Sequence, residues 1–225
     1  MPRAAIWDVD GTLVDTAEQH FRAWVDVCRE KGRDFTRADF AATFGRRNPE
    51  ILAYLFGDRM GQREAEAFAD RKEELYREAS RQGIDLLPGV AALMEALHQL
   101  GWKQAIGSSA PRANLELILE LTGVDRYLGA VVGSEDTSRG KPDPQVFLVA
   151  AQRLGVEPKD AVVFEDAVAG VQAARAAGMR CVAVSFVGHH SPDKLREAGA
   201  DVVVGSLEEI DAAGVVALLK EPRTK

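Results

Sequence analysis

The sequence predicts an α/β fold, a doubly wound parallel sheet, with a small all-helical domain inserted after the first strand. Beyond residue 86, short runs rich in Val and Ile alternate with helical patterns. Most of these helical patterns end in Gly, which accepts the left-handed conformation at a helix C-terminus, and several begin at Pro. Between residues 16 and 85, by contrast, Val and Ile are few and helical periodicity dominates.

Uninterrupted apolar strands that alternate with helices are typical of a parallel sheet covered on both faces. The first strand is expected at the apolar run 4–7. Further strands are expected at 104–107, 130–133, 161–164, 181–184 and 201–204. Helices are expected at 88–100, 111–121, 144–154, 167–177 and 192–198, and a frayed end at 221–225.

The domain organisation follows from the break in this alternation. We expect residues 1–15 and 86–225 to form the α/β core, and residues 16–85 to form a helical cap. Such a cap stands over the carboxyl edge of the sheet, where ligands bind, and can exclude water and select the substrate. Its first helix carries an apolar stripe formed by Phe21, Trp24, Val25 and Cys28, in which Trp24 is expected to be a packing residue.

Composition narrows the possible partners and compartments. The 225 residues are 46% hydrophobic, which is enough for one core plus an insertion. A net charge of −7 argues against binding nucleic acid through a basic surface. Cys28 and Cys181 form no Cys-x-x-Cys motif, which favours a reducing compartment. Without a signal-like start or an apolar run of ~20 residues, we expect a cytoplasmic protein, a monomer with no membrane partner.

Asp8 and Asp10 directly follow the first predicted strand. Strand periodicity places residues i and i+2 on the same side, so the two carboxylates should converge. Their repulsion is costly unless a cation or a shared proton relieves it. The pair therefore predicts a metal site or an acid/base pair; the alternative is an acidic turn of the Asp-Gly type.

Polar side chains also follow three further predicted strands, and in a parallel sheet these strand ends lie at one edge. Carboxylate oxygens without accompanying His or Cys favour Mg²⁺ over zinc. The polar side chains are Ser108 and Ser109, then Lys141 in a Lys-Pro pair, then Glu165 and Asp166.

The order of these motifs resembles the haloacid dehalogenase superfamily over nearly the whole chain. The motifs are Asp8-Val-Asp-Gly-Thr-Leu-Val-Asp-Thr, a Ser after the second strand, Lys-Pro before a helix, and Glu-Asp after an apolar strand. The insertion is similar to the superfamily's first cap type, and residues 16–24 resemble the β-phosphoglucomutase subfamily and its phosphatase relatives. The resemblance implies Mg²⁺ and a small phosphorylated metabolite, such as a sugar phosphate.

The chemistry of the core residues agrees with this resemblance. Asp8, already ionised at neutral pH, needs no base to attack phosphorus and forms an acyl phosphate. Asp10 is expected to be the general acid and then the base, and to be kept protonated in the ground state to limit repulsion. Asp8 and Asp166 are expected to hold Mg²⁺, with Glu165 as a ligand or an outer partner. The resemblance adds the backbone carbonyl of Asp10 as a metal ligand.

Other residues are expected to bind the substrate. Ser108 should contact a phosphoryl oxygen, although it could instead cap the next helix. Lys141 should neutralise Asp8 and the transferring group, unless it is a solvated loop lysine. The remaining candidates are the backbone N–H groups of Gly11 and Thr12, Ser109, the cap residues His20 and Lys72, and Arg47 or its neighbour Arg46, either of which could instead face water.

Several functions remain open. A sugar phosphomutase needs a second phosphate seat, which in β-phosphoglucomutases resembles Ser-x-Ser-Lys-Asn plus an Arg in the cap. This chain has Ser-Ser-Ala-Pro-Arg at 108–112 and Asn48 at the cap position. The sequence therefore favours a Mg²⁺-dependent phosphatase over a mutase. A non-catalytic phosphate-binding module should have lost one of the core acids. The presence of Asp10 argues against a dehalogenase. A P-loop kinase is excluded because the chain has no P-loop motif.

Overall fold

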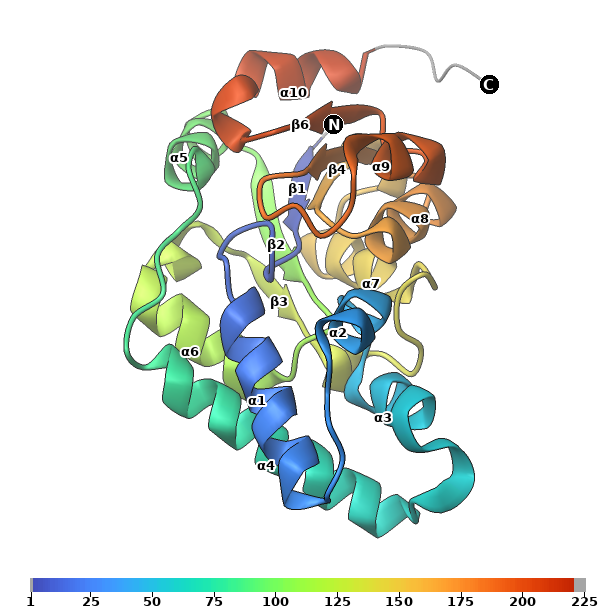
Figure 1. Ribbon diagram of the computed structural model, residues 1–225. Coiled ribbons are helices and arrows are strands. Elements are labelled where there is room, and N and C mark those ends of the chain that lie inside the picture. The colour runs from blue at the N-terminus through green and yellow to red at the C-terminus, as the bar shows by residue number, and fades with distance from the viewer. Residues whose placement is uncertain (1, 221–225) are drawn as a thin grey trace.

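The computed structural model describes residues 2–220 and contains a six-stranded parallel sheet in the order β3-β2-β1-β4-β5-β6 (Figure 1). Each strand lies within one residue of its predicted run, because a strand buried on both faces reads as an uninterrupted apolar segment. The strands are β1 (Ala4–Trp7), β2 (Lys103–Gly107), β3 (Ala130–Val132), β4 (Ala161–Glu165), β5 (Arg180–Val184) and β6 (Val202–Val204).

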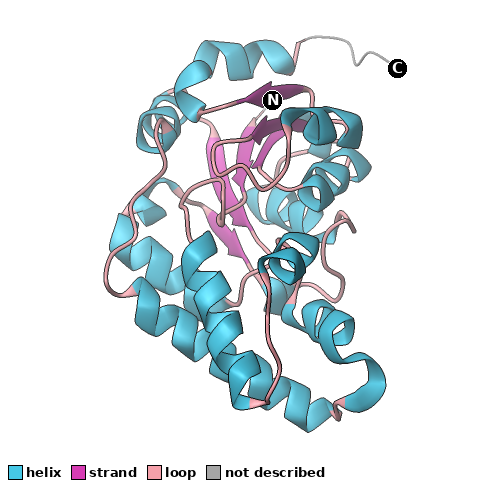
Figure 2. Cartoon of the chain, viewed as in Figure 1, coloured by secondary structure: helices cyan, strands magenta, loops and turns pink. Residues whose placement is uncertain are grey.

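Helices cover both faces of the sheet, as Figure 2 shows. Side chains such as Trp7 and Phe164 pack on one face with α5, α6 and α10, whereas Ile6 and Val163 pack on the other with α7, α8 and α9. The helices are α5 (Val90–Gln99), α6 (Arg112–Thr122), α7 (Gln145–Leu154), α8 (Val168–Ala176), α9 (Pro192–Ala198) and α10 (Ala212–Leu218). Short 3₁₀ turns lie at Gly57–Arg59, Val124–Tyr127, Ser134–Asp136, Pro158–Asp160 and Leu207–Glu209.

Helix α10 is the one core helix that the sequence did not predict. It has seven residues and contains Gly214, so it carries little periodic signal. Asp211 caps it by accepting a hydrogen bond from the Gly214 amide, and Val215 and Leu218 are buried. The frayed end expected at 221–225 lies outside the described residues.

Four helices form the inserted segment, here called the cap: α1 (Ala17–Glu30), α2 (Arg37–Thr43), α3 (Asn48–Phe56) and α4 (Gln62–Ser80). They enclose a hydrophobic cluster of their own that includes Trp24, Phe40 and Phe68, so Trp24 packs as predicted. None of the helices within residues 2–220 has the length and apolar character needed to cross a membrane.

Two chain segments join the cap to the core. Val14 and Leu86 form an antiparallel bridge, and the Leu87 amide donates to the Leu13 carbonyl at 2.8 Å. The two connections between cap and core therefore lie side by side, at the carboxyl edge of the sheet.

Candidate active site

The ends of β1, β2 and β4 bring the core residues together. Trp7 pairs in register with Ile106 and with Phe164, so the residues that follow these strands emerge at the same level. Asp8, Ser108, Lys141, Glu165 and Asp166 are all buried there and line one cavity with residues of the cap. Within it, about 70 Å³ is open to the centres of water-sized molecules. Because cap and core residues line the cavity together, this arrangement is here called the closed state.

Three carboxylates form a compact acidic group. Oxygens of Asp8, Glu165 and Asp166 lie within 4.8 Å of one another. Lys141 Nζ donates to Asp8 Oδ1 and to Glu165 Oε1, each at 2.6 Å, so Lys141 is no solvated loop lysine. Gly11 makes room for this group, because its φ is +88° and a Cβ there would overlap the Asp166 carboxylate.

The acidic group fits a divalent cation. Both oxygens of Asp166 are buried and have no hydrogen-bond partner among the described residues, an arrangement that is costly without a cation. Burial, opposed by the charge of Lys141 and reinforced by that of Glu165, raises the pKa of Asp8 to about 8, so the expectation that Asp8 is ionised at neutral pH does not hold for the metal-free site. A bound cation would favour the ionised form. Burial and the charges of Glu165 and Asp8 raise the pKa of Asp166 well above its usual range. All three oxygen donors are of the type that Mg²⁺ prefers.

The side chain of Asp10 turns away from this group and towards the cap. Asp10 Oδ1 accepts a hydrogen bond from Thr16 Oγ1 and lies 3.2 Å from His20 Nε2. Burial alone would raise the pKa of Asp10, but the contact with His20, the Thr16 hydrogen bond and the charge of Lys72 lower it. In the closed state these contacts favour the ionised form of Asp10, whereas a protonated form is expected from the sequence.

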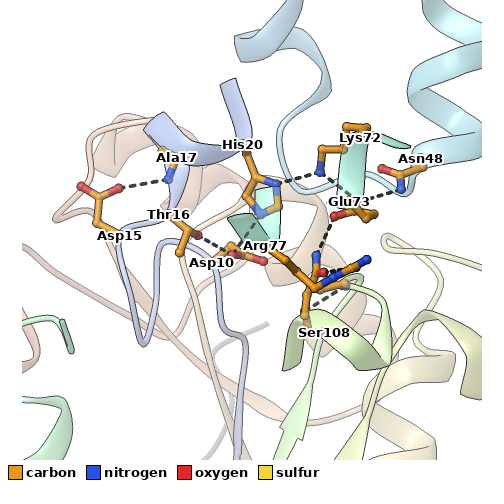
Figure 3. Close-up of polar contacts among 12 residues, drawn as sticks. Asp10, Asp15, Thr16, Ala17, His20, Asn48, Lys72, Glu73, Arg77 and Ser108 are labelled. Carbon is orange, nitrogen blue, oxygen red and sulfur yellow. Dashed lines mark hydrogen bonds and ion pairs between the residues drawn. The ribbon is translucent and has the colours of Figure 1, made fainter. Parts of the chain in front are cut away.

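The cap contributes a polar chain that begins at Asp10 (Figure 3). Lys72 Nζ lies 2.8 Å from His20 Nδ1 and 2.9 Å from Glu73 Oε1. Because an ammonium group only donates, His20 Nδ1 must accept, and the His20 ring proton is assigned to Nε2, which faces Asp10. His20 also stacks on Tyr76 with ring centroids 3.9 Å apart. The structure thus brings the predicted cap residues His20 and Lys72 to the cavity.

Ser108 and Ser109 both line the cavity. Ser108 Oγ accepts from the Ala110 amide at 3.1 Å, while helix α6 begins after Pro111 with no side-chain cap. Ser108 is therefore not the cap of that helix. One lone pair and the hydroxyl proton of Ser108 remain for a ligand.

Two predicted substrate contacts are not brought to the cavity. The backbone N–H groups of Gly11 and Thr12 are used inside the turn, where they donate to the carbonyls of Val14 and Val9 at 2.8 and 3.2 Å, so they are not free donors. The Arg47 guanidinium donates to the Thr137 carbonyl at 2.9 Å and to its hydroxyl. Arg46, not Arg47, lines the cavity, at an exposed position.

Sequence reasoning missed Glu73. It lies within a run of charged residues on α4, which reads as a solvated face, yet Glu73 is only 5% exposed and lines the cavity. Lys72 and Tyr76 are four residues apart, so they lie on the same side of α4, and Glu73 lies beside them on this inward side. This spacing was the signal in the sequence.

Known proteins are similar to this chain in sequence and in fold. The family model of haloacid dehalogenase-like hydrolases matches residues 2–178. Validoxylamine A 7'-phosphate phosphatase of Streptomyces hygroscopicus subsp. limoneus is 32% identical over 93% of this chain and 96% of its own. Fructose-1-phosphate phosphatase YqaB of Escherichia coli is 34% identical over 81% and 96%. The β-phosphoglucomutase structure from Clostridium difficile superposes with a TM-score of 0.88 at 25% identity and covers 98% of each chain.

The chain belongs to the haloacid dehalogenase-like hydrolase family. The predicted resemblance, the α/β fold and the enzyme class, a phosphohydrolase, are thereby confirmed.

Proposed function

We propose that this protein is a Mg²⁺-dependent phosphatase that hydrolyses a small phosphate monoester, such as a sugar phosphate, through an aspartyl phosphate at Asp8. One observation carries the proposal: the Asp8 carboxylate lies in a buried acidic group with Asp166, whose oxygens have no hydrogen-bond partner within residues 2–220. The two phosphatases that resemble the chain along most of its length support the same reaction.

Each residue has a distinct part in the first half-reaction. The phosphoryl group enters between Asp8 and Ser108, and the Ser108 hydroxyl donates to one of its oxygens. Asp8 attacks phosphorus, and Lys141 holds the attacking carboxylate by its hydrogen bond to Oδ1. Bound Mg²⁺, held by Asp8, Glu165 and Asp166, would supply positive charge against the phosphoryl oxygens. The backbone carbonyl of Asp10 is a further proposed ligand.

Asp10 moves the protons. It lies two residues from the nucleophile and is hydrogen bonded to Thr16. Asp10 takes up a proton from water while the cap is open, passes it to the leaving oxygen when the ester bond breaks, and then removes one from the water that opens the aspartyl phosphate. Because the cap lies over the site and lines it, we propose that the cap opens for the ester to enter and closes to exclude bulk water during the first step. We place the protein in the cytoplasm as a monomer.

Phosphate release from p-nitrophenyl phosphate tests the proposal. We expect turnover with Mg²⁺ and a loss of at least about a thousandfold after chelation or in Asp8→Asn. Undiminished turnover of Asp8→Asn would refute it.

A second assay uses β-glucose 1-phosphate with a trace of the 1,6-bisphosphate. Glucose 6-phosphate formed without matching free phosphate would replace the phosphatase by a mutase.

A further inference from the structure

Glu73 is a buried carboxylate in the cavity that the proposed reaction does not use. Its carboxylate accepts three hydrogen bonds, from donors in both the cap and the core. Asn48 Nδ2 and Lys72 Nζ, both in the cap, donate to Oε1 at 2.7 and 2.9 Å. Asn114 Nδ2, on helix α6 of the core, donates to Oε2 at 2.6 Å. The carboxylate is therefore held in one orientation by cap and core together.

Glu73 carries its negative charge over the whole working range of pH. Burial alone would raise the pKa of Glu73, but the charge of Lys72 and the hydrogen bonds from Asn48 and Asn114 lower it to about 2. Arg77 supports the arrangement, since its Nη1 donates to Asn114 Oδ1 at 3.0 Å.

The charge balance of the cavity leaves little room for a second anion. Among the described lining residues, Asp8, Glu165 and Asp166 form the proposed Mg²⁺ site, where Lys141 is also paired. The other two carboxylates, Asp10 and Glu73, lie on the cap side, where Lys72 is already paired with Glu73. Arg46 is exposed to solvent, which weakens its field inside the cavity. A phosphate ester already brings negative charge beside Asp8. A second anionic group near Glu73 would therefore meet a fixed like charge at a buried position.

We propose that Glu73 is a specificity-determining residue that selects esters with a neutral, hydroxyl-bearing leaving group and rejects those with a second anion. An ionised carboxylate offers about four acceptor positions, and the three bonds described leave one on Oε2 for a substrate hydroxyl. Asn48 donates to this carboxylate. It occupies the cap position at which β-phosphoglucomutases are expected to carry an Arg, so this chain has no cation there. The inference rests on the proposed phosphatase function and deepens it.

Matched pairs of esters provide the test. Glycerol 3-phosphate and 3-phosphoglycerate differ only in a terminal hydroxymethyl or carboxylate group, and glucitol 6-phosphate and 6-phosphogluconate form a second such pair. Each compound is used as a competitor of p-nitrophenyl phosphate hydrolysis. The selectivity ratio compares how strongly the neutral and the carboxylate member of a pair compete, and it is obtained even for a compound that is turned over slowly. We expect the wild-type protein to prefer the neutral member at least about tenfold, equivalent to about 1.4 kcal/mol.

In Glu73→Gln, which keeps the shape of the side chain, we expect the ratio to fall at least about fivefold. Glu74→Gln is the control, because Glu74 is exposed on the same helix and pairs with Arg71 at the surface. It removes the same charge and should leave the ratio unchanged. If Glu73 only held cap and core together, both members of each pair would weaken equally and the ratio would stay constant.

Other outcomes separate this inference from the proposed function. A wild-type preference for the carboxylate member would overturn the inference and indicate that Arg46 binds a distal anion. An unchanged ratio in Glu73→Gln, or no competition by either pair, would also overturn it while p-nitrophenyl phosphate hydrolysis left the phosphatase proposal intact. If Glu73→Gln does not fold, as judged by circular dichroism, Asn48→Lys takes its place. A cation beside Glu73 should lower the ratio in the same direction, and no change there would refute the inference.

Discussion

The carboxylate of Asp10 lies 3.2 Å from the imidazole of His20, so a residue beside the nucleophile is tied to the first helix of the cap. Lys72 holds the other side of the imidazole from helix α4. The orientation of Asp10 therefore depends on two cap helices being in their closed positions. Proton transfer is thereby linked to closure of the cavity.

Substitution of His20 tests this link. We expect His20→Ala to lower kcat between about tenfold and a hundredfold, because Asp10 loses a positioning partner while its own carboxyl group remains. His98→Ala is the matched control, since His98 is exposed on helix α5. Steady-state kinetics with p-nitrophenyl phosphate measures the effect. Equal activity of His20→Ala and wild type would show that the contact has no role in the reaction.

Arg46 and Arg47 are adjacent but have different surroundings, and their alanine variants should differ. Arg46 lines the cavity, so Arg46→Ala should raise KM for a phosphate ester about threefold or more. Arg47 is bonded to Thr137 across the cap–core boundary, so Arg47→Ala should leave KM within about twofold and lower the melting temperature by a few degrees. A larger KM effect from Arg47→Ala than from Arg46→Ala would contradict the structure.

The Asp166 side chain should destabilise the metal-free protein, because both of its carboxylate oxygens are buried and have no hydrogen-bond partner in the described part of the chain. In EDTA we expect Asp166→Asn to melt at a higher temperature than wild type. Added Mg²⁺ should raise the melting temperature of wild type, as any ligand of the native state does, and leave that of Asp166→Asn unchanged. Asp193→Asn serves as the control, since Asp193 is exposed on helix α9. Equal stabilisation of Asp166→Asn by Mg²⁺ would place the ion elsewhere.

Much of the fold could be predicted from the sequence because the physics is local. The run Ala161–Phe164 reads as a strand since both of its faces are buried, and the residues after it reach the site through the register with β1. Asp8, Ser108, Lys141 and Asp166 were found because parallel strands place their carboxyl ends at one edge. Helix α10 was missed because seven residues that include a Gly carry too little periodicity.

The rest of the site depends on partners that lie far away in the chain. Whether Arg46 or Arg47 faces the cavity is decided by Thr137, some 90 residues further on. Glu73 reads as a surface residue until Asn114 of the core is placed against it. The lowered pKa of Asp10 follows from His20 and Thr16, whose side-chain directions no spacing rule specifies.

Glu73 should also shape the acid stability of the protein. Its pKa in the native state is about 2, below the ordinary 4.5, so native stability from Glu73 is present above pH 4.5 and is lost as the pH falls towards 2. The free-energy difference between wild type and Glu73→Gln should shrink by about 2 kcal/mol between pH 6 and pH 3. Denaturant unfolding at several pH values measures it. A difference that is independent of pH would show that the Glu73 carboxylate is not stabilised in its ionised form.

The central claim is that Asp8 takes the phosphoryl group from the substrate. The most direct measurement is to mix the enzyme with p-nitrophenyl phosphate and Mg²⁺, quench with acid within the first turnover, and reduce with borohydride, which converts an aspartyl phosphate into homoserine. Peptide mass spectrometry should then find homoserine at position 8 in wild type and none in Asp8→Asn. Homoserine at another aspartate, or an unmodified Asp8 in an enzyme that is turning over, would contradict the account.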